Sequence, residues 1–549
     1  MLNESIAPAL IPLPVLLPLL GAAAALFFSR HYRVQRYITL AVLSSVFVVA
    51  AMLMYLTDQY GTHVVQVGEW GAPVGISLVA DRLSALMLLI SSAVLLAVLI
   101  YSVGQGIRDG HHQQPVSIFA PTYLALTAGI CNAFLAGDLF NLYVGFEILL
   151  AASFVLLTIG VSKERVRAGI TYVLVSMVSS IIFLIGIAFA YAATGTLNLA
   201  HMAVRMQDVP EGTSTAIFAV LLVAFGVKAA VFPLYGWLPD SYPTAPAPVT
   251  AVFAGLLTKV GIYAIIRTHT LVFPGGLLDD VLLVAALLTM LIGILGAIAQ
   301  SDIKRLLSFT LVSHIGYMLF GIALSSSLGL AGAIFYAAHH IIVQTTLFLV
   351  VGLIERQAGS ASLRRLGGLA KASPLLALIF FVPALNLGGI PPFSGFIGKV
   401  ALVQAGADDA SLLAWILVAG GIVTSLLTLY VVARIWTKAF WRDRADAPEG
   451  HLVASRPTAL VDDAFDVPYG ERADVGRMPA LMVAPTAGLA VLGLTLTLLA
   501  GPFFAYSNRA AENLRERTDY ISTVLDVDPE VLQGLDTPIS GTDALGGDR

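Results

Sequence analysis

The chain has 549 residues, of which 58% are hydrophobic and only 12% are charged, and its formal net charge is −4. Soluble globular proteins carry about a quarter charged residues, so this composition excludes a soluble domain and indicates many membrane-spanning helices. The single cysteine, Cys131, excludes an intrachain disulfide and any cysteine-based metal or iron-sulfur cluster.

Apolar runs long enough to cross a hydrocarbon core of about 30 Å recur along the whole chain. They lie at residues 7–28, 37–57, 78–103, 117–136, 139–160, 168–193, 216–235, 247–270, 279–299, 305–325, 329–353, 374–405, 411–439 and 480–505. We therefore predict an all-α polytopic membrane protein with about 14 transmembrane helices, numbered here in chain order from one to fourteen.

Basic residues are unevenly divided between the two sets of loops. Twenty of the 30 lie in loops that follow odd-numbered helices, whereas the opposite loops carry acids such as Glu69, Asp208, Asp279 and Asp408. Loops rich in Lys and Arg stay in the cytoplasm. Because the number of helices is even, we predict that both termini lie on the extracytoplasmic side.

A short motif interrupts two of the apolar runs. Pro-x-x-Gly followed by an aromatic residue occurs at 233–237 in helix seven and at 392–396 in helix twelve. Proline removes a backbone donor and breaks a helix, so Pro233, Pro391 and Pro392 predict discontinuous helices. The copies are five helices apart, and an odd offset reverses the direction of the second copy. We expect inverted repeats, which place polar sites at broken helices in transporters.

The repeat divides the chain into six expected parts. These are helices one to three at 1–110, the first five-helix repeat at 111–275, the second at 276–440, a cytoplasmic loop at 441–479, helix fourteen at 480–505 and a tail at 506–549. The loop is charged and contains Pro and Gly, so we expect it to be irregular. The tail begins with AENLRERTDYISTVL, which predicts a short surface helix.

Besides the charges near the ends of the runs, Glu147, Lys228, Lys259 and Lys399 lie within apolar stretches of the sequence. A charged side chain at the centre of a membrane helix costs about 2.5–3.5 kcal/mol on insertion scales, so each needs a partner, water or a functional reason. We predict that Glu147 and Lys228 form a coupled pair that switches proton occupancy. The alternative is a static contact between two helices.

Histidines lie between the outer lysines in the sequence. Imidazoles titrate near neutral pH, so His314 and the pair His339 and His340 can bridge Lys259 to Lys399. Adjacent residues on a helix point about 100° apart, so we expect one of the pair, His339, to face the path. His314 has a second interpretation, as a buried hydrogen-bonding residue.

Charged groups at helix ends have weaker interpretations. Asp81 and Arg82 open helix three and suggest an orienting pair, and Asp138 is placed to cap helix five. Asp240 follows the broken part of helix seven and could draw cations in from the cytoplasm.

Several chemistries have no motif in this chain. It contains no P-loop, no Gly-rich dinucleotide turn and no HExxH, so we predict neither a cofactor nor a metal site. Haem held by His314 and His339 is disfavoured by the surrounding lysines. An integral-membrane enzyme using buried His and Lys is the alternative from another class. However, an enzyme needs convergent groups, and these residues are spread over seven or more helices.

Four stretches carry a family resemblance. They are DLFNLYVGFEILLAASFVLL, FGVKAAVFPLYGWLPDSYPTAPAPVTAVFAGLLTKVGIYAIIR, SDIKRLLSFTLVSHIGYMLF and LNLGGIPPFSGFIGKVAL. They resemble the antiporter-like subunits shared by Mrp-type sodium/proton antiporters and respiratory complex I. The chain length and the GTLNLA element at 195–200 are most similar to the D-type subunits of Mrp complexes.

The resemblance implies a proton-translocating subunit of a multisubunit Na+/H+ antiporter in a prokaryotic plasma membrane. It implies that Glu147 and Lys228 are a coupled pair, Lys259 a central lysine, His339 a bridge and Lys399 the terminal lysine. Its implied partners are other membrane subunits, Na+, H+ and lipid, with no nucleic acid. Gln344 is a departure, because some members have lysine in that stretch. A pumping subunit of complex I is the alternative within the family.

Overall fold

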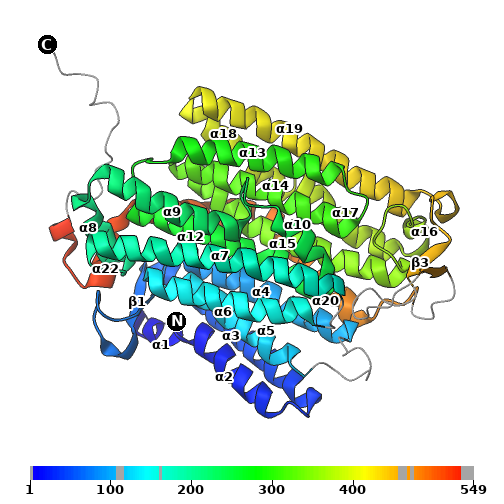
Figure 1. Cartoon of the computed structure of the whole chain (residues 1–549), viewed down its shortest axis with the longest axis horizontal. Helices are drawn as coiled ribbons and strands as arrows, with labels where there is room; N and C mark the ends of the chain where they lie inside the picture. Colours follow the sequence, from blue (N-terminus) through cyan, green and yellow to red (C-terminus); the bar gives the residue numbers. More distant parts are fainter. Residues whose placement is uncertain (1–3, 107–116, 160–162, 455–465, 470–474, 533–549) are drawn as a thin grey trace.

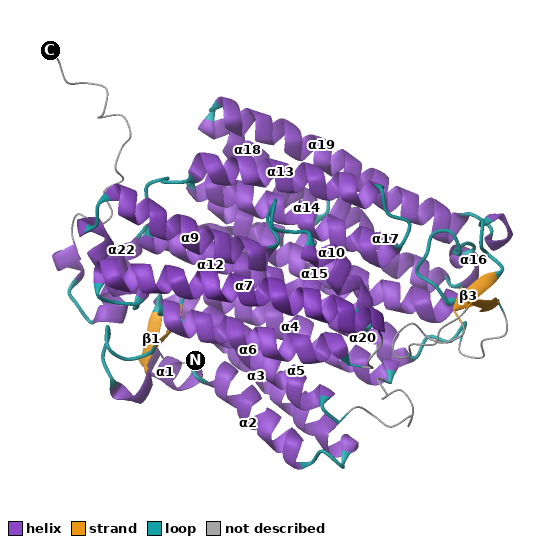
Figure 2. Cartoon of the chain, viewed as in Figure 1, coloured by secondary structure: helices purple, strands orange, loops and turns teal. Residues whose placement is uncertain are grey.

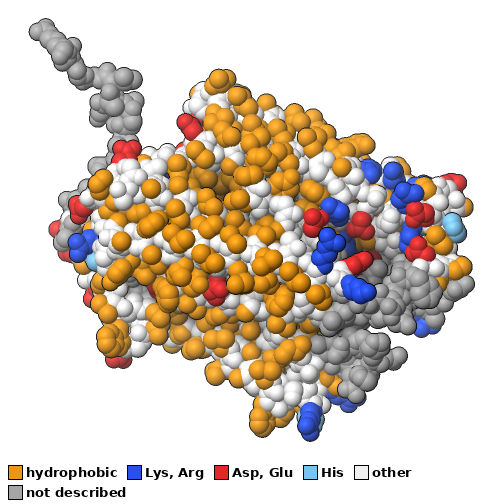
Figure 3. Space-filling view, viewed as in Figure 1, with side chains coloured by type: hydrophobic (Ala, Val, Ile, Leu, Met, Phe, Trp, Pro, Cys, Tyr) orange, Lys and Arg blue, Asp and Glu red, His pale blue; other side chains and the backbone are white. Residues whose placement is uncertain are grey.

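The computed structural model describes residues 4–106, 117–159, 163–454, 466–469 and 475–532. In these ranges, twelve helices are long and apolar enough to cross a membrane, and two shorter apolar helices, Phe119–Leu135 and Pro374–Gly388, lie among them (Figure 1). The predicted polytopic, mostly helical architecture is confirmed. Hydrophobic side chains cover most of the face in Figure 3, as expected for a surface in contact with lipid or with other membrane proteins.

In the described residues of the N-terminal half there are twelve α-helices and one pair of strands. They are α1 (Ala7–Leu10), α2 (Leu13–Phe27), α3 (Tyr32–Tyr60), β1 (His63–Gln66), β2 (Ser77–Ala80), α4 (Arg82–Gln105), α5 (Phe119–Leu135), α6 (Leu139–Thr158), α7 (Lys163–Thr194), α8 (Leu199–Arg205), α9 (Glu211–Ala229), α10 (Trp237–Ser241), α11 (Ala247–Val252) and α12 (Thr258–Arg267). Two π-helical turns, Phe253–Leu257 and Thr268–Val272, flank α12.

The C-terminal half continues in the same style. Its elements are α13 (Asp279–Ile298), α14 (Ile303–Ala323), α15 (Ser327–Ala358), α16 (Leu369–Ala372), α17 (Pro374–Gly388), α18 (Ser394–Asp409), α19 (Leu412–Ile435), a π-helical turn (Trp436–Trp441), β3 (Leu452–Ala454), β4 (Asp466–Pro468), α20 (Ala480–Leu498), α21 (Ala500–Arg515) and α22 (Arg517–Leu525).

The centre of the bundle is formed by α15 and by the continuous segment α11–α12. The most apolar stretches of both segments are wholly buried inside the protein. In α2, α3 and α20, only 33% of the corresponding stretch is buried. The central helices carry Lys259 and the two adjacent histidines. Small residues allow close packing around them: a Cβ on Gly293 of α13 would lie 2.5 Å from the backbone nitrogen of Ser313 in α14. Such close helix contacts are typical of membrane bundles.

Two strand pairs lie at opposite ends of the helices (Figure 2). At one end, β1 and β2 pair antiparallel, with His63 opposite Ala80. At the other end, β3 and β4 pair antiparallel within the loop after α19. Neither hairpin was predicted, because each strand has only three or four residues and lies in a stretch too short for a period-2 pattern to stand out.

The loop at 441–479 is more ordered in its described parts than we expected. Arg365 donates to Glu449 at 3.0 Å and to Asp466 at 2.8 Å, and Lys371 donates to Asp443 at 3.0 Å. The hydrogen bond from Arg365 lowers the pKa of the Glu449 carboxyl. These contacts hold the loop against the segment between α15 and α17, and Figure 3 shows charged side chains gathered at this end.

One backbone pattern occurs twice, 164 residues apart. Leu139 N–H donates to Leu197 O at 2.9 Å, and Ile303 N–H donates to Ala361 O at 3.1 Å. These residues begin α6 and α14, which are capped by the side chains of Asp138 and Asp302 respectively. The following helices, α7 and α15, both contain 32 residues and begin and end at the same spacing. The capping role predicted for Asp138 is confirmed.

The C-terminal helix α22 covers a buried ion pair. Asp81 caps α4, and its Oδ2 lies 2.7 Å from Nη1 of Arg267 at the end of α12. The Arg267 guanidinium lies 5.1 Å from the ring centroid of Tyr520, in α22. Tyr520 is itself buried, so one face of α22 packs against the protein while Asp519 stays exposed. Asp81 therefore pairs with Arg267, whereas Arg82 pairs with Asp58 at 3.2 Å.

Candidate functional site

The break that follows α9 positions Lys228. The helix ends at Ala229, Ala230 is left-handed with φ +59°, and α10 begins only at Trp237. Pro233 lies inside this interruption, so the predicted discontinuity of helix seven is seen. Lys228, in the last turn of α9, donates to the carbonyl of Ser176 and the hydroxyl of Ser180, both at 3.3 Å.

The structure places Glu147 and Lys228 near one another but not in an ion pair. Glu147 is on α6, one residue after Phe146, and the Lys228 ammonium lies 5.7 Å from the Phe146 ring centroid. No oxygen of Glu147 lies within 4.0 Å of the Lys228 nitrogen. Glu147 Oε1 is buried and has no hydrogen-bond partner. The Phe146 ring and two serines of α7 therefore provide the described contacts of this lysine.

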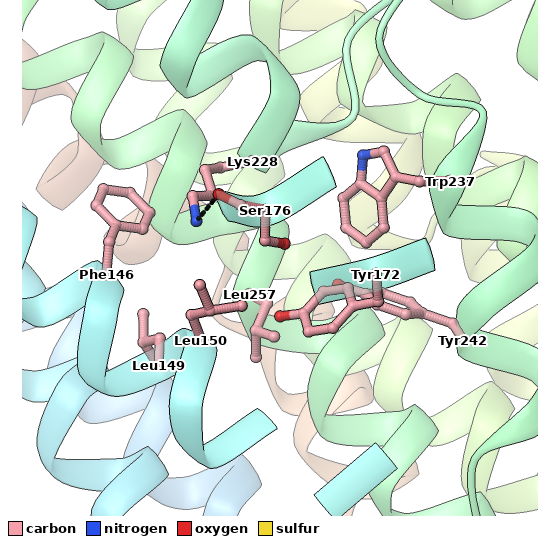
Figure 4. Close-up of a pocket in the computed structure, with 9 residues that line it drawn as sticks. All are labelled: Phe146, Leu149, Leu150, Tyr172, Ser176, Lys228, Trp237, Tyr242 and Leu257. Carbon is pink, nitrogen blue, oxygen red and sulfur yellow. Dashed lines mark hydrogen bonds between the residues drawn. The ribbon is translucent and has the colours of Figure 1, made fainter. Parts of the chain in front are cut away.

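A small cavity of about 20 Å³ adjoins Lys228. Figure 4 shows Lys228 and Ser176 on one side, and the rings of Tyr172, Trp237 and Tyr242 on the other. A single water needs roughly 10–15 Å³ of such space. Tyr242 has a buried hydroxyl without a hydrogen-bond partner, so the cavity has both the room and the polar groups to hold water.

Lys259 lies at the start of α12, directly after a π-helical turn. Its ammonium donates to Ala254 O at 2.7 Å, and the side chain is fully buried. Residues Phe253–Leu257 form this turn, whose wider winding changes the carbonyl pattern; π-turns often occur at functional sites. Leu257, the last residue of the turn, also lines the Lys228 cavity, so the turn that precedes Lys259 borders that cavity.

An aromatic and imidazole cluster occupies the middle of the bundle. His314 on α14 hydrogen-bonds through Nδ1 to the Tyr336 hydroxyl at 2.7 Å, and its ring centroid lies 5.2 Å from that of His340. His340 is fully buried and neither of its ring nitrogens has a hydrogen-bond partner. Its ring therefore adds a second imidazole, from α15, to the cluster around His314.

His339 makes a different set of contacts from its neighbour. Its Nδ1 lies 3.0 Å from the hydroxyl of Ser394, the first residue of α18. The Ser394 hydroxyl in turn donates to Oδ1 of Asn386 at 3.3 Å. The adjacent histidines thus meet different polar groups, His340 on the side of His314 and His339 on the side of the second break.

Lys399 lies beside the second break, between α17 and α18. Pro391 and Pro392 fall in this interruption, which spans 389–393. The Lys399 ammonium donates to Leu387 O at 3.2 Å, Gly388 O at 3.3 Å and Ser425 Oγ at 3.1 Å. The carbonyls at the C-terminus of α17 carry partial negative charge, so the end of one half-helix receives the ammonium of the next.

The remaining candidate, Asp240, lies away from these lysine and histidine contacts. It is exposed, and its Oδ1 accepts from Arg305 at 2.8 Å across to α14. The neighbouring Lys304 pairs with Glu355 at 2.7 Å. Asp240 therefore belongs to a charged rim at the end of α10.

Sequence reasoning missed the neutral partners of the charged groups. Ser176, Ser180, Tyr336, Asn386 and Ser394 all contact a predicted lysine or histidine or lie one hydrogen bond away. Their signal was present as hydroxyl and amide side chains in otherwise apolar helices. Single hydroxyls are common in membrane helices, where they bond to their own backbone, so composition alone did not separate these five from the rest.

Three comparisons relate the chain to known proteins. The family described as "NADH:quinone oxidoreductase/Mrp antiporter, TM" matches residues 136–428. A protein of Alkalihalophilus pseudofirmus, named as the D-type subunit of a Na(+)/H(+) antiporter, is 38% identical over 519 residues, which are 94% of this chain and 99% of the relative. The match thus includes both helix breaks.

Solved structures give the same relationship. A chain of the Mrp complex from Dietzia sp. DQ12-45-1b superposes with a TM-score of 0.84 and 34% identity, covering 96% of this chain and 100% of that one. A chain of respiratory complex I from Thermus thermophilus has a TM-score of 0.69 and 22% identity, over 90% and 98% of the two chains. At that identity the likeness concerns the fold alone.

Proposed function

The chain belongs to the NADH:quinone oxidoreductase/Mrp antiporter transmembrane family, and from that membership we propose how protons cross it. It is a subunit of a multisubunit cation/proton antiporter and works beside other membrane subunits, as its relatives do. It is a transporter subunit and not an enzyme, and complex I is a distant relative. The transported cation is Na+, by similarity to relatives named for Na+/H+ exchange.

The proton path runs from Glu147 and Lys228, through Lys259 and the histidines, to Lys399. One observation carries this proposal: the three lysines inside the helix bundle, two of them buried and Lys228 half-buried, donate to backbone carbonyls and serine hydroxyls. None of these acceptors carries a charge, so none of them fixes the ammonium in its charged form. Charged residues inside membrane segments mark ion paths by default, and lysine can exchange its proton where arginine cannot.

The two adjacent histidines serve consecutive halves of the path. Water in the Lys228 cavity would link that lysine to the aromatic end of α10, and His340 with His314 would connect Lys259 to the centre of the bundle. His339 would then pass protons through Ser394 toward Lys399. Both adjacent histidines are used, because each contacts a different part of the bundle.

The scaffold of this path is two inverted five-helix repeats within fourteen helices. The 164-residue spacing between α6 and α14, and between α7 and α15, supports this arrangement. Residues 111–275 and 276–440 are the two repeats, preceded by helices at 1–110 and followed by the 441–479 loop, helix 480–505 and the 506–549 tail. Both termini lie outside the cell, an assignment supported by the basic loops after odd-numbered helices.

Antiport in membrane vesicles tests the path. Lys228→Ala and Glu147→Ala should each abolish cation-dependent proton movement while the purified complex retains all its subunits, because each removes a titratable group. Lys371→Ala is a matched control, since Lys371 is exposed and pairs with Asp443 outside the helices. Parental antiport in both Lys228→Ala and Glu147→Ala would contradict the proposed path.

A further inference from the structure

A threonine from the second half of the chain reaches into the break of the first half. The backbone N–H of Phe232, next to Pro233, donates to Oγ1 of Thr289 at 3.0 Å. Thr289 is on α13 and is fully buried. Three other N–H groups at this break bond locally: Ala230 donates to Val227 O, Val231 to Gly226 O and Leu234 to Val231 O.

The same device occurs at the second break. Here the backbone N–H of Ser394 donates to Oγ1 of Thr497 at 3.0 Å. Thr497 is on α20, which follows the second five-helix unit, just as α13 follows the first. Each threonine hydroxyl also donates to the carbonyl four residues earlier, Ala285 O at 2.6 Å and Gly493 O at 3.2 Å. At each break, one threonine hydroxyl thus links an intact helix to the interrupted helix.

The hydroxyl at Thr289 is well placed to affect Lys228. Phe232 lies four residues after Lys228, where the chain leaves α9 and turns into the interruption. In a membrane interior an N–H without an acceptor is strongly disfavoured, so the Thr289 hydroxyl determines where Phe232 lies. The direction in which the chain leaves α9 then sets how the last turn, including Lys228, faces Ser176 and Ser180.

We propose that Thr289 is a positioning residue for proton transfer, holding the Lys228 half of the path in register with the second half of the protein. The inference rests on the proposed function, because it requires Lys228 to carry protons. Movement of α13 is transmitted to the break through one hydrogen bond, and Thr497 connects α20 to Ser394 and His339 in the same way.

The test compares three variants in the assembled complex. Thr289→Val keeps the shape and removes the hydroxyl, Thr289→Ser keeps the hydroxyl, and Thr486→Val is the matched control. Thr486 is a fully buried threonine whose hydroxyl donates to Met482 O in its own helix. We expect Thr289→Val to lower the antiport rate by about tenfold, the scale of a buried donor left unsatisfied. Thr289→Ser and Thr486→Val should each stay within about twofold.

Hydrogen exchange of the purified complex gives a second readout. Thr289→Val should accelerate exchange in the peptide 226–236, and Thr289→Ser should restore protection, because the acceptor for Phe232 N–H returns. A Thr289→Val complex with parental rate and protection would overturn the inference, as would equal losses in Thr289→Val and Thr486→Val. Loss of subunits from Thr289→Val would also count against it, since the role would then be structural.

A Lys228→Ala complex measured alongside separates this inference from the function on which it rests. If Lys228→Ala is inactive and Thr289→Val is unchanged, only the positioning role of Thr289 fails. If Lys228→Ala retains antiport, the proton path itself fails, whatever Thr289→Val shows.

Discussion

The two interrupted helices have nearly the same backbone geometry at the break, but their lysines lie on opposite sides of it. Ala230 and Gly389 are both left-handed, with φ of +59° and +77°. One residue later, Val231 N–H and Ile390 N–H each donate to a carbonyl five residues back. The helix-stopping geometry is thus repeated at a spacing of 159 residues, which also relates Pro233 to Pro392.

At that spacing the lysines do not coincide. Lys228 precedes its break and corresponds to Leu387, whereas Lys399 follows its break and corresponds to Asp240. If the repeats are inverted, α9 and α17 run in opposite directions, and residues before one break lie in the same half of the membrane as residues after the other. Moving the lysine across the break therefore keeps both lysines in one layer. The two breaks thus share a backbone geometry but carry their lysines on opposite sides of the interruption.

The largest effect is expected where the second break loses its titratable group. Lys399→Arg keeps the positive charge but cannot release a proton, so antiport should fall to background, as it should in Lys399→Met. The measurement is cation-dependent pH change in vesicles carrying the intact complex. Antiport retained in Lys399→Arg but lost in Lys399→Met would show that Lys399 acts only through its charge.

An intermediate effect is expected from a methyl group at the left-handed position of the second break. A Cβ on Gly389 would lie 3.0 Å from both Cδ and Nζ of Lys399, and the left-handed conformation costs a residue with a Cβ about 1–2 kcal/mol. Gly389→Ala should reduce the antiport rate several-fold and lower the melting temperature of the complex.

Ala230→Gly is the matched control at the corresponding position of the first break. Ala230 already holds a left-handed conformation with its methyl group in place, so removing that group creates no clash. Transport should stay near the parental rate. Equal losses in Gly389→Ala and Ala230→Gly would mean that the backbone, and not Lys399, is what Gly389 protects.

The smallest effect is expected at Asp240, the counterpart of Lys399. Its ion pair with Arg305 is exposed, with side-chain exposures of 63% and 48%, and such pairs contribute about 0–1 kcal/mol. If Asp240 draws cations in, Asp240→Asn should slow antiport by about twofold at low ionic strength, and salt should remove the difference by screening. Asp443→Asn, in an exposed pair with Lys371, should show no such dependence.

Much of the scaffold could be predicted because apolar length and broken-helix motifs are local signals. The run at 329–353 became α15, and Pro233 and Pro392 marked both interruptions. The π-turn before Lys259 could not be predicted, since it changes hydrogen bonding without changing composition. The Asp81–Arg267 pair joins residues far apart in the sequence, and no pattern indicated that Asp81 would choose Arg267 over its neighbour.

The charged residues of the site could be predicted from the sequence, whereas the groups that contact them could not. Lys228, Lys259 and Lys399 stood out because charge is rare in apolar runs, whereas their acceptors are carbonyls that every residue has. The expectation that only His339 faces the path stays a prediction. His339 and His340 do point apart, as helix geometry requires, but polar groups lie on both sides of α15.

The helix that covers Asp81 and Arg267 is synthesised after every other α-helix that the structure describes. Tyr520 of α22 reaches the Arg267 guanidinium only after α20 and α21 have been synthesised. Until then the pair joining α4 to α12 lacks its aromatic cover, although both of its residues left the ribosome hundreds of positions earlier. This end of the protein is therefore assembled only once α22 has been synthesised, and a chain that stops before residue 517 keeps the long apolar helices that the structure describes but lacks α22.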